Sequence, residues 1–152
     1  MYQMHRVFCA TSWELEGERR AFYDMIGEFN EAEAMKRSVL YVPVTLVNIR
    51  DKRPFQYVVD ENIRECRHYL LALSDNWGPP ERNFEPDHRL ALACRADPSL
   101  PMREVAFLWR KPLAGHSTPA GLPVPAAEFS TRDEFKVQVR HLLGEWLATL
   151  NP

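Results

Sequence analysis

Short apolar runs alternate with longer amphipathic segments along the chain. Four of the runs have the length and the β-branched or aromatic content of buried strands. They cover residues 6–10, 39–49, 68–74 and 105–109. Pro43 cannot donate a hydrogen bond to a sheet, so we expect it to mark the beginning of the second strand or a bulge.

The segments between these strands show the three-to-four-residue spacing of helices. Thr11 and Glu14 have the spacing of a capping box and predict a helix that begins near Ser12 or Trp13 and runs to about Phe29. The remaining helices are expected over residues 60–67, 86–96 and 131–150. A second capping box, Thr131 with Glu134, opens the last of them.

This alternation of strands and helices predicts an α/β fold with helices on both faces of a parallel sheet of four to five strands. We therefore expect a flavodoxin-like three-layer sandwich that forms a single domain over residues 1–152, with a Pro/Gly-rich loop at 113–126. Ligands of such sheets bind outside the carboxyl ends of the strands. The residues after positions 10, 49, 73 and 109 are therefore the first places to search for a site.

Composition narrows the possible partners. The chain has 152 residues, 45% of them hydrophobic, and a formal charge of −2, so no overall field favours nucleic acid or an anionic membrane as a partner. No apolar run approaches the roughly 20 residues that cross a bilayer, and the first residues lack a signal peptide's apolar region, so we expect a cytoplasmic protein. Cys9, Cys66 and Cys94 form no CxxC pair and are expected to be small core residues. The histidines show no metal-ligand spacing, and no metal site is expected.

Residues 7–20, VFCATSWELEGERR, resemble the opening of the TIR-like domains of unknown function. In that family the first strand is followed by a Ser/Thr pair, by an acidic residue next to a leucine, and by a Glu-Arg pair on the first helix. Residues 62–66, 69–73 and the Trp77-Gly78 turn are similar to the family's second helix, third strand and following turn. The resemblance covers residues 5–112 and is most specific over residues 7–20.

The resemblance implies a fold related to Toll/interleukin-1 receptor domains. It also implies a signalling or defence-type module that binds a nucleotide or a protein partner, or that self-associates as a homo-oligomer. An alternative is an enzyme of the N-glycosidase or deoxyribosyltransferase type that cleaves NAD or a nucleoside. No resident cofactor is expected, and NAD or a nucleotide would be a substrate or ligand.

The enzymes among these relatives carry a catalytic glutamate on the helix after the third strand. By position, the candidates here are Asp87 and, as the nearest glutamate, Glu85. A carboxylate at this place could stabilise an oxocarbenium-like sugar, although acids at the start of a helix are also favoured by its dipole. His88, beside Asp87, could act as an acid or base or be a surface histidine.

Five further residues are candidates for ligand binding. They follow the first and third strands: Thr11, Ser12, Ser74, Asn76 and Trp77. The hydroxyl groups could hold a phosphate or a ribose or could cap the helix, and Trp77 could stack on a base or shield the core. Neither a GxGxxG nor a GxxxxGK[ST] motif follows the first strand, which excludes the common dinucleotide and P-loop sites.

Overall fold

Five strands form one parallel sheet in the computed structural model, which describes residues 1–46, 52–112 and 121–150. The strands are β1 (Gln3–Thr11), β2 (Val39–Val44), β3 (His68–Leu73), β4 (Glu104–Arg110) and β5 (Ala127–Phe129). Their order across the sheet is β2-β1-β3-β4-β5, and every neighbouring pair is parallel. This is the strand order of flavodoxin-like, doubly wound domains.

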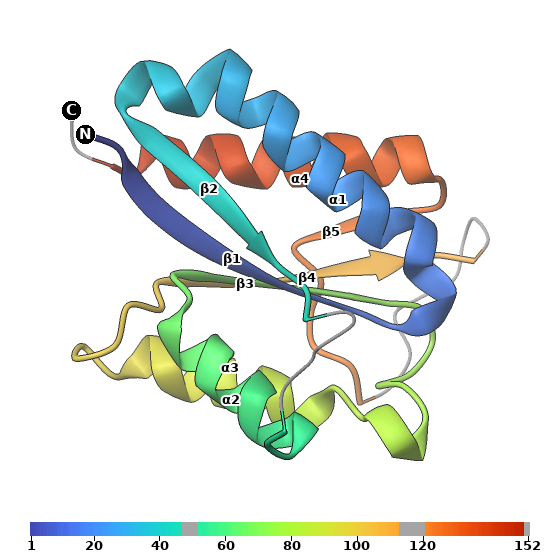
Figure 1. Cartoon of the computed structure of the whole chain (residues 1–152). Coiled ribbons are helices and arrows are strands. Elements are labelled where there is room, and N and C mark those ends of the chain that lie inside the picture. Colours follow the sequence, from blue (N-terminus) through green and yellow to red (C-terminus); the bar gives the residue numbers. More distant parts are fainter. Residues whose placement is uncertain (47–51, 113–120, 151–152) are drawn as a thin grey trace.

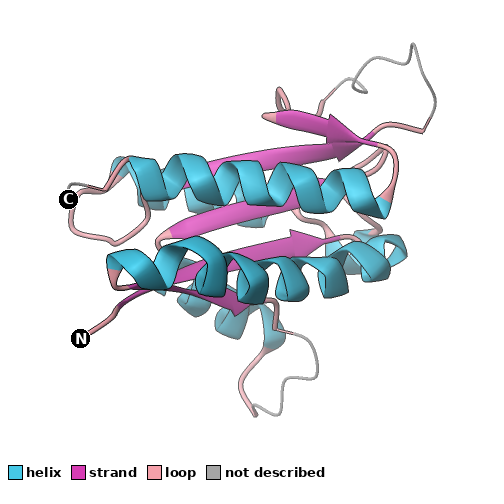
Figure 2. Ribbon diagram, turned by 90° about the horizontal axis from the view of Figure 1, so that it is seen from above, coloured by secondary structure: helices cyan, strands magenta, loops and turns pink. Residues whose placement is uncertain are grey.

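Helices cover both faces of this sheet, so the predicted three-layer sandwich is confirmed. Figures 1 and 2 show α1 and α4 side by side on one face and α2 and α3 on the other. The four helices are α1 (Glu16–Phe29), α2 (Phe55–Glu65), α3 (Glu85–Ala96) and α4 (Arg132–Ala148). Shorter helical turns are η1 (Trp13–Leu15), η2 (Asn30–Ala34), η3 (Met35–Arg37) and η4 (Pro80–Arg82).

The central strands are apolar on both sides because each side meets a helical layer. On β1, Val7 and Cys9 belong to the core under α1 and α4, whereas Phe8 and Ala10 belong to the core under α2 and α3. Burial on both faces is why these strands read as continuous apolar runs. The three cysteines are free and buried, as expected.

The second strand is shorter than predicted. β2 ends at Val44, Thr45 and Leu46 lie outside it, and residues 47–49 of the predicted strand are outside the described part of the chain. Pro43 lies inside β2, so its expected place at the strand's beginning is wrong. The sheet tolerates it there because β2 is an edge strand, where a missing N–H need not interrupt a ladder.

Two more boundaries differ from the prediction. α2 begins at Phe55 instead of residue 60, because Val58 and Val59 are buried with Ile63 on one face of the helix. The short strand β5 was not predicted, since its three residues follow a Pro/Gly-rich segment without a strand-like run. Residues 121–126 of the predicted loop contain no helix or strand, and residues 113–120 lie outside the described segments.

Of the two predicted capping boxes, the second is confirmed. The Thr131 hydroxyl accepts a hydrogen bond from the Glu134 N–H at 3.1 Å, and the Glu134 carboxylate accepts one from the Ser130 N–H at 3.0 Å. The first is wrong: Ser12 is the N-cap of η1, without a side-chain cap, and Thr11 is the last residue of β1. Continued pairing of Thr11 with Ala72 of β3 keeps it in the strand.

Within residues 1–46, 52–112 and 121–150, no helix has both the length and the apolar character needed to cross a membrane. The same residues contain no cluster of three or more His, Cys, Asp or Glu side chains that could hold a metal ion.

Ser38 ends the helical segment after α1 in the left-handed conformation, with a φ of 58°. Its N–H donates to the Met35 carbonyl at 3.0 Å, and its own carbonyl accepts from the Gln3 N–H at 2.8 Å. These backbone bonds hold an exposed non-glycine residue where glycine is normally preferred.

We therefore expect Ser38→Gly to stabilise the protein by about 0.5–1 kcal/mol, because glycine adopts this conformation without a Cβ clash. Urea unfolding followed by circular dichroism measures the change. Lys36→Gly, in the preceding turn, is the matched control and should destabilise by a similar amount. A loss of stability in Ser38→Gly would contradict this account of the turn.

A buried polar cluster lies near the amino ends of β1, β2 and β3. The rings of His5, Tyr41 and His68 lie 5.7–6.1 Å from one another, and His68 stacks on Trp146 of α4 at 4.3 Å. Neither ring nitrogen of His68 finds a hydrogen-bond partner in the described part of the chain. Burial, followed by the charges of His5 and Arg67, lowers the pKa of His68 to about 3. The native state therefore holds this imidazole neutral.

A histidine whose pKa is lower in the folded than in the unfolded state makes the protein less stable as the pH falls below the unfolded value of about 6.5. The unfolded chain binds the proton first, so we expect a loss approaching about 1.4 kcal/mol per pH unit between pH 6 and pH 4. His68→Phe should reduce this slope in urea unfolding at a series of pH values. His141→Phe, at an exposed position of α4, controls for the loss of an imidazole. An equal slope in wild type and His68→Phe would exclude His68 as the cause.

Candidate functional site

The carboxyl ends of the strands lie at one end of the sheet, where β1 extends beyond β2 (Figure 1). The pairing of β1 with β2 ends at Phe8 and Val44, whereas its pairing with β3 continues to Thr11. A hollow of about 340 Å³ lies against this last part of β1. We call it the β1–β2 pocket. Its lining comes from the end of β1, the two residues that follow β2, η1 and the first halves of α1 and α2, together with Pro79, Arg82 and Phe84.

Two exposed aromatic side chains line the β1–β2 pocket. Trp13, on η1, is 79% exposed, and Phe55, at the start of α2, is 48% exposed. Leu46, where the chain leaves β2, also lines the pocket and has a φ of 53°, which costs a non-glycine residue about 1–2 kcal/mol. Exposed aromatic rings beside a hollow are suited to stack on a flat ligand.

A buried ion pair holds Arg82 at the wall of this pocket. Its guanidinium lies 2.7 Å from an oxygen of Asp87, whose side chain has no exposed surface. The other oxygen of Asp87 accepts a hydrogen bond from Gln56 at 2.8 Å. The guanidinium also lies over the rings of Phe84 and Phe55, at 4.2 and 5.3 Å from their centroids. These contacts fix a cation whose side chain is still 26% exposed.

The other side of the pocket carries Glu16 and Arg19 from the first turn of α1. Arg19 Nε donates to Glu16 at 2.8 Å, and this hydrogen bond lowers the pKa of the Glu16 carboxyl. Glu16 is therefore ionised and paired. The ion pair between Arg19 and Glu16 lies on the surface of α1, where half of the Glu16 side chain is exposed.

The structure separates the residues predicted for catalysis from the β1–β2 pocket. Asp87 lies in α3, next to the pocket but behind Arg82, and it does not line the hollow. Glu85 pairs with Arg89 on the outside of α3. His88 is buried, and burial lowers its pKa.

The predicted binding residues are also distributed over several places. Thr11 lines the β1–β2 pocket, and Ser12 is buried beside it with a hydroxyl that has no partner in the described residues. Ser74 lines a different hollow, and Asn76 accepts a hydrogen bond from the Gly78 N–H at 2.8 Å within its own turn. Trp77 donates to the Gly121 carbonyl at 3.0 Å and lines a third hollow with Glu85 and His88. The structure thus brings Trp77 and Glu85 together, away from Thr11.

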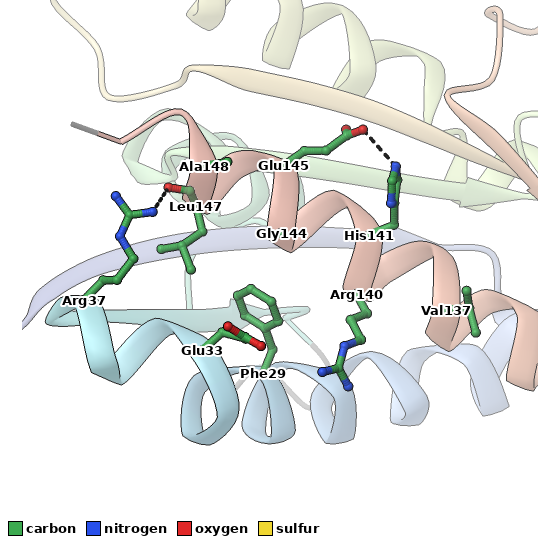
Figure 3. A pocket seen from close by; sticks show the side chains of 10 residues that line it. All are labelled: Phe29, Glu33, Arg37, Val137, Arg140, His141, Gly144, Glu145, Leu147 and Ala148. Carbon is green, nitrogen blue, oxygen red and sulfur yellow. Dashed lines mark hydrogen bonds and ion pairs between the residues drawn. The ribbon is translucent and has the colours of Figure 1, made fainter. Parts of the chain in front are cut away.

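A larger groove of about 710 Å³ lies between the outer surfaces of α1 and α4 (Figure 3). It is formed by the end of α1, the turns that follow it and residues 137–148 of α4, and it extends toward the end of the sheet opposite the strands' carboxyl ends. Phe29 and Arg140 reach into the space between the helices, and Arg37 Nη1 donates to the Leu147 carbonyl at 2.7 Å. The latter contact satisfies a carbonyl at the end of α4, which gives Arg37 a structural role.

Sequence reasoning missed Trp13, Phe55 and Arg82. For Trp13 the sequence offered a signal of a site residue, because Trp13 directly follows the Thr11-Ser12 pair at the end of the first strand. For Phe55 the sequence offered no such signal, because the second helix was predicted to begin at residue 60 and Phe55 was therefore not placed on any element. Arg82 was missed because only the structure shows that the helix after β3 turns Asp87 inward.

Fold and site together define a flavodoxin-like α/β domain with a pocket beside its first strand that carries exposed aromatic rings and two ion-paired arginines. Comparisons of this chain with protein-family models, with curated protein sequences and with solved structures give no match.

We expect Asp87→Ala to destabilise the protein by about 2–4 kcal/mol, because it leaves the largely buried Arg82 guanidinium without its counterion and removes one of the two carboxylates that accept from the Gln56 amide. Urea unfolding measures this loss. Glu85→Ala is the matched control on the same helix, and it should cost less than about 1 kcal/mol because its ion pair with Arg89 is solvent-exposed. Equal effects of the two substitutions would contradict a structural role for Asp87.

Proposed function

We propose that this chain is a TIR-like module of the signalling or defence type that binds a nucleotide or a nucleoside-like ligand in the β1–β2 pocket. The observation that carries the proposal is the joint presence of Trp13, Phe55 and Arg82 at one hollow. Two exposed rings offer stacking surfaces to a base, and a fixed guanidinium offers hydrogen bonds to an anionic or carbonyl group. The pocket also lies where doubly wound sheets bind ligands, outside the carboxyl ends of the strands.

We propose binding instead of cleavage because the expected catalytic acid does not reach the pocket. Both oxygens of Asp87 are engaged, by Arg82 and Gln56, and the side chain is fully buried. Free, buried cysteines suit the reducing cytoplasm in which we expect such a module to act.

The test is a titration of the protein with NAD, adenosine 5′-phosphate and adenosine, followed by calorimetry and by tryptophan fluorescence. We expect Trp13→Ala to weaken binding about tenfold or more, since stacking of one base contributes about 1–3 kcal/mol. Trp77→Ala is the matched control, because Trp77 also follows a strand but lines another hollow. Unchanged affinity in Trp13→Ala, or no binding of any of the three probes to the wild type, would overturn the proposal.

The same samples test the enzymatic alternative. We expect no release of nicotinamide from NAD or of base from a nucleoside. If release occurs, the carboxylate variants identify its origin. Loss of turnover in Glu16→Gln would assign cleavage to the β1–β2 pocket, and loss in Asp87→Asn, in a protein that remains folded, would restore Asp87 as the catalytic acid.

A further inference from the structure

We infer that a second hollow, at the carboxyl ends of β3 and β4, binds a doubly charged oxyanion of the phosphate type. This β3–β4 pocket has a volume of about 440 Å³. It is lined by Glu14, Ser74, Asp75, Arg110, Lys111, Pro112 and Ser130. It differs in position and in chemistry from the β1–β2 pocket, so the inference goes beyond the proposed function.

The cations of this pocket are more buried than its acids. Arg110 and Lys111 are partly buried, whereas Glu14 and Asp75 are exposed. Charges at an exposed position are screened by water and salt, and partly buried charges are screened less. Arg110 and Lys111 therefore contribute more to the field inside the hollow than Glu14 and Asp75 do, although the lining contains two acidic and two basic residues.

Arg110 has no counterion among the described residues. Within residues 1–46, 52–112 and 121–150, its guanidinium makes no ion pair and no hydrogen bond, whereas Lys111 lies 3.4 Å from Glu128. Removing a guanidinium partly from water without a partner is unfavourable, and a bound anion would supply that partner. The planar fork of an arginine matches two oxygens of a phosphate group.

The backbone around Arg110 is held in place on both sides. The Trp109 indole donates to the Ser74 carbonyl at 2.6 Å, which joins the ends of β3 and β4. The Ser130 hydroxyl donates to the Lys111 carbonyl at 3.0 Å, and the Lys111 N–H donates to the Phe129 carbonyl at 2.8 Å. An anion would therefore meet a site whose frame is already formed, which reduces the entropic cost of binding.

One further feature favours an anion here: the hydroxyl of Ser74, which lines the hollow, can donate to an anion's oxygen. The nearby amino end of α4 adds little, because its first turn carries Asp133 and Glu134 and the Glu134 carboxylate already accepts from the Ser130 N–H at 3.0 Å. Glu14, by contrast, is an exposed carboxylate that lines the same hollow and would repel a bound anion. Removing its charge therefore provides a second test of anion binding.

The experiment measures binding of inorganic phosphate by phosphorus NMR and calorimetry. We expect saturable binding to the wild type, at least about tenfold weaker binding to Arg110→Ala, and partial recovery in Arg110→Lys. Glu14→Gln should strengthen binding a few-fold by removing a repelling charge. Arg95→Ala, at an exposed position of α3, is the matched control and should bind as the wild type does.

Two more arms separate this inference from the proposed function. Trp13→Ala should retain phosphate binding while it loses stacking of adenosine, and Arg110→Ala should do the reverse. Adenosine 5′-phosphate compared with adenosine shows whether the oxyanion is free or part of a nucleotide. No saturable binding of phosphate to the wild type, or equal affinities of wild type and Arg110→Ala, would overturn the inference, whatever the outcome for Trp13.

Discussion

β1 pairs in parallel with β2 on one edge and with β3 on the other, and the rest of the structure depends on this arrangement. A parallel connection must cross over a face of the sheet, and such crossovers are right-handed. Because β2 and β3 lie on opposite sides of β1, the crossover through α1 covers one face and the crossover through α2 covers the other. The segments that leave the carboxyl ends then diverge around the tip of β1, and space for a ligand remains between them.

The ion pair between Asp87 of α3 and Arg82 positions a side chain of the β1–β2 pocket. A carboxylate without exposed surface is costly to bury, and its partner's charge together with the Gln56 hydrogen bond offsets that cost only in a well-defined geometry. The pair consequently fixes Arg82 between Phe55 and Phe84. The acid that looked catalytic by position thus has a clear role in placing a neighbouring cation.

The fold was predictable from the chain because its signals are local and repeated. The parallel strand β3 is buried along its whole length and is an aromatic and aliphatic run after His68, and α4 carries a capping box and a regular apolar stripe. The predictions for Pro43 and for the first capping box were wrong because both depend on tertiary context. Pro43 is tolerated inside β2 because β2 is an edge strand. Thr11 remains in β1 because it pairs with β3. Local spacing carries neither kind of information.

The site was less predictable because it depends on which way neighbouring residues face. Residues that follow the predicted strands do line hollows, as expected from the fold. However, Thr11, Ser74 and Trp77 line three different hollows and do not form one site. In a tight turn such as η1, successive side chains point about 120° apart. Trp13 therefore faces the β1–β2 pocket while Glu14 faces the β3–β4 pocket. One three-residue turn at the tip of β1 thus borders two hollows of different chemistry, one lined by exposed aromatic rings and one lined by charged and hydroxyl side chains.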